Sequence, residues 1–182
     1  MKRTAILLSV TALLTAAQLS AKIVEKAPAA FKVTQVRHVA VPPDVAWRSL
    51  VHVEQWWSGE HTYSGDAANM KLDARPGGCW CETLPNGGGV VHMTVVYVVP
   101  NQRLTLSGGL GPLQTAGVSG AMTLQVTPKE GGTDVALMYN VGGYYPGGLD
   151  SVAGGVDEVL TEQFDRLARL IATGSAEAKP AP

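Results

Sequence analysis

Hydrophobic residues near the end of the chain recur at helical spacing. Between residues 150 and 172 most of them fall three or four positions apart, at Val152, Val156, Val159, Leu160, Phe164, Leu167, Leu170 and Ile171. This spacing places one apolar stripe along an α-helix, which at about 1.5 Å per residue is on the order of 30 Å long. Asp150 or Ser151 suits its N-cap, and Gly174 suits its end. The pattern predicts a long amphipathic helix whose apolar side covers another part of the chain.

Most of the chain before this helix is typical of β-strands. Alternating apolar and polar residues, or apolar runs between turn residues, predict strands at residues 31–41, 69–75, 79–84, 90–99, 103–107, 118–127 and 133–141. In the first strand Phe31, Val33 and Val39 share a face with Gln35 and Arg37, so the pattern leaves open which face is buried. The turns between strands are too short for parallel crossovers, and an antiparallel sheet is predicted.

A break of two prolines separates the first strand from a short helical stretch. Pro42 and Pro43 end the strand, and residues 45–53 suit a helix that continues into the sequence EQWW at 54–57. The predicted fold class is α+β. A curved antiparallel sheet of about seven strands wraps around the C-terminal helix, with a short helix pair after the first strand.

The N-terminal residues have the pattern of a secretory signal peptide. Lys2 and Arg3 precede an apolar run at residues 5–17, and small residues allow cleavage after Ala17 or Ala21, of which Ala21 is preferred. The alternative is a membrane anchor, but the run is shorter than the ~20 residues that a span needs. We therefore expect a signal peptide at 1–21, a linker at 22–30, one domain at 31–173 and a disordered tail at 174–182. The expected location is the bacterial periplasm or the medium.

Charge and composition narrow the function classes. Without Lys2 and Arg3 the chain keeps 12 basic against 15 acidic residues, a net charge of −3. An acidic balance argues against nucleic-acid binding. No later segment is long and apolar enough to span a membrane, so the mature chain is expected to be soluble, as a monomer or homodimer.

Three local motifs, in this order of elements, resemble one superfamily. PPDVAW at 42–47 resembles the P-x-x-V-W entry into the first helix of the SRPBCC or START-like helix-grip superfamily, and Trp56-Trp57 resembles its tryptophan pair. RPGGCWCE at 75–82 resembles the P-G-G-x-x-x-E hairpin of the branch named after activators of the heat-shock chaperone ATPase. The resemblance covers residues 31 to about 172.

This resemblance implies that the helix grips the sheet and that a cavity between them binds apolar or aromatic small molecules. Relatives of the polyketide cyclase and lipid transport kind include cyclases, dehydratases and hydrolases. The chaperone role of the named branch is not carried over, because an exported chain would not meet a cytosolic partner.

The candidate ligand-binding residues are aromatic, apolar or histidine side chains on the predicted elements. Core packing is the alternative role for each aromatic ring, but one of two adjacent tryptophans at a helix end is expected to face the cavity mouth. The expected wall comprises Trp56, Trp57, His61, Tyr63, Met70, Trp80, Glu82, His92, Met122, Tyr139, Val156 and Leu160.

Gly154 and Gly155 interrupt the predicted helix, where each costs about 1 kcal/mol relative to alanine. Either the helix begins later, near Val156, or the missing side chains leave room for a ligand.

Cys79 and Cys81 form a C-x-C pair on one strand face. Three states are open. They are buried free thiols, a disulfide in an oxidising compartment, or metal ligands together with His61 or His92. In an extended strand their Cα atoms would be almost 7 Å apart, at the limit for a disulfide.

An enzyme is the alternative to a binding protein, and the sequence leans towards binding. His61 is the best acid–base candidate, with Asp66 and Glu82 as further candidates. The sequence contains no G-x-S-x-G, P-loop or H-E-x-x-H motif, and no cofactor is expected.

Overall fold

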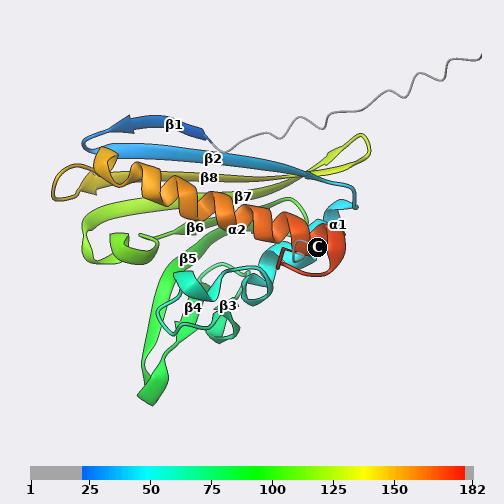
Figure 1. Ribbon diagram of the computed structural model, residues 1–182, viewed down its shortest axis with the longest axis horizontal. Helices are drawn as coiled ribbons and strands as arrows, with labels where there is room; N and C mark the ends of the chain where they lie inside the picture. Colours follow the sequence, from blue (N-terminus) through cyan, green and yellow to red (C-terminus); the bar gives the residue numbers. More distant parts are fainter. Residues whose placement is uncertain (1–21, 179–182) are drawn as a thin grey trace, which may run out of the picture.

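The computed structural model describes residues 22–178, and within them eight strands form one antiparallel sheet (Figure 1). The strands are β1 (Lys22–Ala27), β2 (Ala30–Val39), β3 (Met70–Leu72), β4 (Cys79–Thr83), β5 (Gly89–Val99), β6 (Arg103–Ser107), β7 (Gly117–Lys129) and β8 (Gly132–Tyr144). Their order across the sheet is β1-β2-β8-β7-β6-β5-β4-β3. The seven predicted strands are all present. The predicted signal peptide at 1–21 lies outside the described residues.

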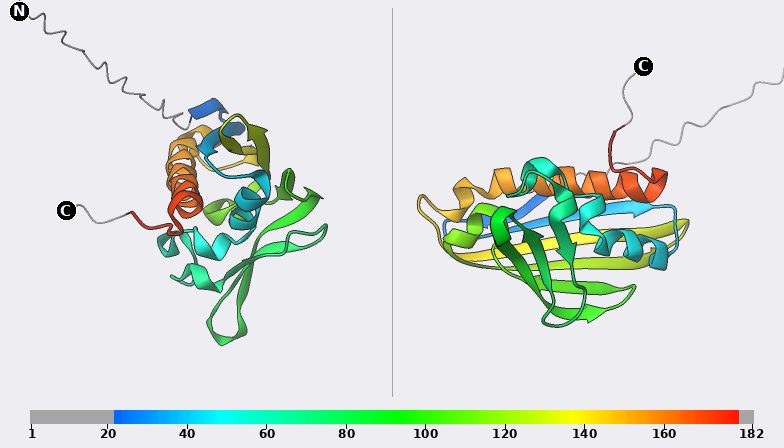
Figure 2. Two further views of the ribbon diagram at one scale, coloured as in Figure 1. Left: turned by 90° about the vertical axis from the view of Figure 1, so that its right-hand side faces the viewer. Right: turned by 90° about the horizontal axis from the view of Figure 1, so that it is seen from below.

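Two α-helices and six short 3₁₀ helices complete the fold within the described residues. The helices are α1 (Pro43–Val51) and α2 (Ala153–Thr173), with η1 (Val53–Gln55), η2 (Gly59–His61), η3 (Ala67–Asn69), η4 (Pro85–Gly87), η5 (Gly111–Thr115) and η6 (Leu149–Ser151). Figure 2 shows α2 running along one face of the curved sheet, with β3, β4 and β5 turned away from β2, β7 and β8. The predicted α+β helix-grip fold is confirmed. None of the helices between residues 22 and 178 is long and apolar enough to cross a membrane.

The structure shows which face of strand β2 is buried. Phe31, Val33 and Val39 are buried, and so is Gln35 between them. Gln35 is tolerated there because its amide donates to Thr161 Oγ1 on α2 at 2.8 Å, which satisfies a polar group taken out of water. The odd-numbered face of β2 therefore packs under the helix.

Helix α2 begins at Ala153, one or two residues later than a cap at Ser151 or Asp150 predicts. Leu149–Ser151 form the separate turn η6, and the N-cap is Val152, with no side-chain cap. Ser151 instead donates its hydroxyl to the Gly148 carbonyl at 2.7 Å. The predicted end is confirmed, because Gly174 takes a left-handed conformation (φ 79°) that favours glycine.

The expected linker and tail are both structured in their described parts. Residues 22–27 form β1, which pairs with β2. At the other end Ala176 is 7% exposed, and Arg169 Nε donates to its carbonyl at 2.9 Å. Arg166 also pairs with Glu177 at 2.6 Å. The domain therefore extends to at least residue 177 at this end, and residues 179–182 of the expected tail are not described.

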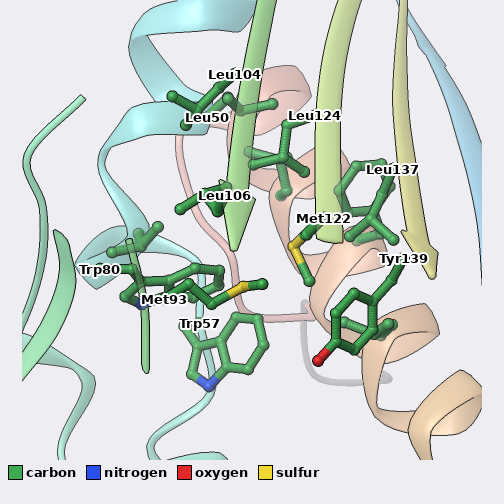
Figure 3. Packing of buried hydrophobic residues seen from close by; sticks show 14 of the residues in the cluster. Leu50, Trp57, Trp80, Met93, Leu104, Leu106, Met122, Leu124, Leu137 and Tyr139 are labelled. Atoms are coloured by element: carbon green, nitrogen blue, oxygen red, sulfur yellow. The ribbon is translucent and has the colours of Figure 1, made fainter. Parts of the chain in front are cut away.

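The core fills the space between α2 and the sheet. Figure 3 shows Trp57, Trp80 and Met93 gathered on one side, and Met122 and Tyr139 from the paired strands β7 and β8 on the other. All are buried. From α2 the apolar stripe contributes Leu160, Phe164 and Leu167, as the helical spacing predicts.

Cys79 and Cys81 form a disulfide. Their Cα atoms are 5.4 Å apart, closer than in an extended strand, because the pairing of β4 with β5 shifts register between Trp80 and Cys81. The free-thiol reading is therefore wrong. For the metal reading, no group of three or more His, Cys, Asp or Glu residues in the described part of the chain is placed to hold a metal ion.

Candidate functional site

A pocket of about 680 Å³ opens where α2 begins. Its walls come from the first turns of α2, the loop that leads into η5, and the segment around η2. The lining residues are Trp57, Glu60, His61, Thr62, Tyr63, Met70, His92, Leu110, Gly111, Pro112, Leu113, Tyr145, Ser151, Val152, Gly155, Val156, Val159 and Leu160. Most of these side chains are apolar or aromatic, and the volume suits a small organic molecule.

The rim of the pocket is held by two tyrosine hydroxyls. Tyr139 accepts from the Leu110 amide at 2.9 Å and donates to the Gly108 carbonyl at 3.2 Å. Its burial raises the pKa of Tyr139 to about 12, so the hydroxyl stays protonated. A Cβ at Gly120 would come within 2.8 Å of this hydroxyl, so only glycine fits there. Tyr63 donates to the Gly111 carbonyl at 3.1 Å from the other side.

Glu82 is a buried carboxylate beneath the pocket, 2% exposed. It accepts hydrogen bonds from the backbone amides of Ser64 and Tyr63 and from the ring of His92, with Nε2 at 2.9 Å from Oε2. Burial alone would raise the pKa of Glu82, but the bonds from Ser64, Tyr63 and His92 outweigh it and hold the pKa below the usual 4.5. Glu82 is therefore ionised at neutral pH and fixes the segment after η2 on strand β4.

His92 joins this carboxylate to the pocket. Burial lowers the pKa of His92 from the usual 6.5, although Glu82 opposes the change. The ring is therefore neutral at pH 7. It lies between the rings of Tyr63, whose centroid is 5.9 Å away, and Trp80, at 6.3 Å. Its second nitrogen, Nδ1, is buried and has no hydrogen-bond partner among the described residues.

The lowered pKa values of Glu82 and His92 predict that the protein loses stability in acid. Between the lowered native pKa of His92 and its unfolded value near 6.5, the unfolded chain binds more protons, so the unfolding free energy falls as pH drops through this range. The contribution of Glu82 is complete above about 4.5 and is lost as pH falls through its lowered native pKa. The free energy of unfolding, measured with urea, should fall less between pH 7.5 and pH 5.5 in His92→Gln than in the wild type. His38, His52 and His61 are common to both proteins, so their effects cancel. Equal losses would contradict the lowered pKa of His92.

Seven of the twelve predicted wall residues line the pocket. They are Trp57, His61, Tyr63, Met70, His92, Val156 and Leu160. Trp56, Trp80, Met122 and Tyr139 are instead buried in the core, each no more than 1% exposed, and Glu82 lies behind His92. Trp56 and Trp57 both pack on Trp80, with ring centroids at 6.2 and 4.8 Å, because the backbone at Trp56 leaves helical geometry after η1.

The predicted acid–base residues are not gathered into one cluster. His61 lines the pocket, and its Nε2 is 3.1 Å from Glu162 Oε2 on α2. The Asp66 carboxylate accepts from the Ala68 amide at 2.9 Å as the cap of η3 and is not part of the lining. Glu82 pairs with His92, a partner that the sequence did not indicate.

The lining residues that the sequence prediction missed are mainly on the rim. Leu110, Pro112 and Leu113 come from the glycine-rich stretch after β6, which has no periodicity. Val152 and Val159 belong to the apolar stripe of α2 and could have been found from it.

The two glycines of α2 differ in their position relative to the pocket. The helix includes both, so the alternative in which it begins near Val156 is wrong. Gly155 lines the pocket and Gly154 does not. A Cβ at either position would meet nothing within 4 Å, so packing does not require glycine at either position, and at Gly155 the free space belongs to the pocket.

Solved structures share this fold at low sequence identity. A conserved protein of unknown function from Enterococcus faecalis, EF2215, is 13% identical over 85% of this chain and 78% of its own, with a TM-score of 0.57. Mll3558 from Rhizobium loti is 23% identical over 76% and 95%, with a TM-score of 0.56. DynU16, a protein of the dynemicin biosynthetic locus, is 20% identical over 80% of this chain and 48% of its own, with a TM-score of 0.56. At these identities the likeness shows the fold.

Among curated proteins none matches the sequence. A family model described as polyketide cyclase / dehydrase and lipid transport matches residues 30–172, which covers strands β2 to β8 and nearly all of α2. The resemblance to the SRPBCC superfamily is thereby confirmed, and the chain belongs to the polyketide cyclase / dehydrase and lipid transport family.

Proposed function

We propose that this protein is exported and binds a small, largely apolar or aromatic molecule in the pocket beneath the start of α2. The observation that carries the proposal is the pocket itself, about 680 Å³ and lined mostly by apolar side chains. Such a pocket takes its affinity from apolar burial, at ~25 cal/mol per Å². A ligand that buries on the order of 200 Å² of apolar surface would gain about 5 kcal/mol before the costs of association.

Export is supported by two independent observations. The first 21 residues have the composition of a signal peptide, and the Cys79–Cys81 disulfide fits an oxidising compartment. The full chain should be expressed in a bacterium and recovered from the periplasm for native mass spectrometry. That spectrum reports the cleavage site and any small molecule that remains bound. Recovery of the uncleaved chain from the cytoplasm would contradict export.

Gly155→Leu should block the pocket without unfolding the helix. Leucine has the higher helix propensity, by up to about 1 kcal/mol, and a side chain at this position extends into the pocket space. We expect the variant to be at least as stable as the wild type and to bind the neutral fluorescent probe N-phenyl-1-naphthylamine at least tenfold more weakly.

The matched control is Gly154→Leu, which makes the same change one position away and outside the lining. It should gain similar stability and keep the wild-type probe affinity. Unchanged probe binding in Gly155→Leu would contradict the assignment of this pocket.

An acid–base enzyme that uses the same pocket is the second candidate. The observation that favours it is the buried Glu82–His92 pair, because a carboxylate that orients a neutral histidine is a common arrangement for a general base. This candidate predicts that a bound compound is released in a changed form, detectable by chromatography coupled to mass spectrometry. Conversion that disappears in His92→Gln would favour the enzyme, and conversion that disappears in His61→Ala would return that role to His61.

A further inference from the structure

The Glu82 carboxylate determines which nitrogen of His92 carries the proton. An ionised carboxylate can only accept hydrogen bonds, and Glu82 already accepts from two backbone amides. Since His92 Nε2 lies 2.9 Å from Glu82 Oε2, the neutral ring must carry its hydrogen on Nε2. The tautomer is thereby fixed, and Nδ1 is left with a lone pair and no hydrogen.

Nδ1 is then an acceptor that the described residues do not use. It is buried and unpartnered, in a side chain that is 3% exposed. Leaving such a group without a hydrogen bond is unfavourable in the folded protein. The rest of the His92 ring is already in contact with other residues. Tyr63 and Trp80 pack against the ring, and Nε2 is hydrogen-bonded to Glu82. His92 also lines the pocket, and Nδ1 is its one ring nitrogen without a hydrogen-bond partner among the described residues.

We propose that the pocket recognises an aromatic ligand bearing a hydroxyl or N–H group, which donates a hydrogen bond to His92 Nδ1. This inference rests on the proposed binding function and narrows its ligand class. A carboxylate or ether at the same position offers only acceptors, and its lone pairs would face that of Nδ1. Phenols and enols are therefore favoured over carboxylates and ethers of the same shape.

The test compares three probes that share one ring system, 2-naphthol, 2-methoxynaphthalene and 2-naphthoate. Calorimetry should show 2-naphthol binding to the wild type about tenfold more tightly than its methyl ether, since one neutral hydrogen bond contributes about 1.4 kcal/mol or less. The carboxylate should bind more weakly than the naphthol. In His92→Gln, whose amide can still donate to Glu82, the preference for naphthol should fall to about twofold or less. His52→Gln, a change at an exposed histidine outside the lining, should keep it.

A second measurement does not depend on a variant that folds. In protein labelled with ¹⁵N-histidine, the His92 Nδ1 resonance should lie in the range of an unprotonated acceptor nitrogen. It should shift on addition of 2-naphthol and stay in place on addition of the methyl ether. Equal affinities for these two probes, or an Nδ1 resonance that does not respond to naphthol, would overturn the inference while leaving pocket binding intact. If none of the probes binds, or if Gly155→Leu binds them like the wild type, the proposed function itself fails.

Discussion

Glu82→Ala should lower the free energy of unfolding by about 3–5 kcal/mol. The variant removes the acceptor of three donors at once, the amides of Tyr63 and Ser64 and the ring N–H of His92. Each buried donor left without a partner costs on the order of 1–3 kcal/mol. The segment after η2 would also lose its attachment to β4, so one wall of the pocket should loosen. Urea denaturation followed by circular dichroism measures the loss.

Two controls separate this effect from a simple change of charge. Glu158→Ala removes an exposed carboxylate from α2 and should change stability by no more than about 0.5 kcal/mol. Glu82→Gln keeps one acceptor oxygen and should recover part of the loss. A loss below about 1 kcal/mol for Glu82→Ala would show that water replaces the carboxylate, and Glu82 would then not be a structural anchor.

Trp80→Ala should cost about 3–5 kcal/mol of unfolding free energy, as expected for a large aromatic side chain deleted from a core. Trp80 is fully buried and packs edge-on against Trp57, with ring centroids 4.8 Å apart and planes at 89°. The cavity left behind removes the support of Trp57, so we expect weaker binding of N-phenyl-1-naphthylamine as well. The same denaturation and fluorescence measurements report both effects.

Trp80→Phe and Tyr144→Ala complete this experiment. The indole Nε1 of Trp80 has no hydrogen-bond partner among the described residues, so phenylalanine removes an unsatisfied group along with some volume and should cost less than alanine. Tyr144 is 74% exposed, and its truncation should leave stability nearly unchanged. If Trp80→Ala were as stable as Tyr144→Ala, the core assignment of Trp80 would be wrong.

The fold was predictable because its elements are periodic. The apolar stripe of α2 and the alternation along β2 follow from burial of one face, which repeats every 3.6 residues in a helix and every 2 in a strand. The start of α2 was not predicted, because Asp150 and Ser151 suit a cap but belong to the turn η6. Strand β1 was missed because KIVEKA is short and carries three charged residues. It is a strand because it pairs with β2, and its composition does not indicate this pairing.

The site was predictable only where it lies on periodic elements. Met70, Val156 and Leu160 were found because a strand or helix face assigns them inward. His92 does not follow this rule, because it and the adjacent Met93 are both buried. Periodicity gives the face of a residue but not its depth, and for this reason Met122 and Tyr139 were predicted as wall and proved to be core. The disulfide depended on a register shift between Trp80 and Cys81, which no spacing in the sequence reveals.

The order of strands in the sheet also bears on how the chain can fold. Strand β2, near the start of the domain, pairs with β1 on one side and with β8 on the other. β8 is the last strand of the chain to be synthesised. The pairing of β2 with β8 cannot form, and α2 cannot cover the sheet, until almost the whole chain has been synthesised. Pairing between such distant segments has to follow the closure of a long loop, which slows folding relative to local pairing. For a protein proposed to be exported, this late closure would keep the chain extended and able to pass through a membrane channel before it becomes compact.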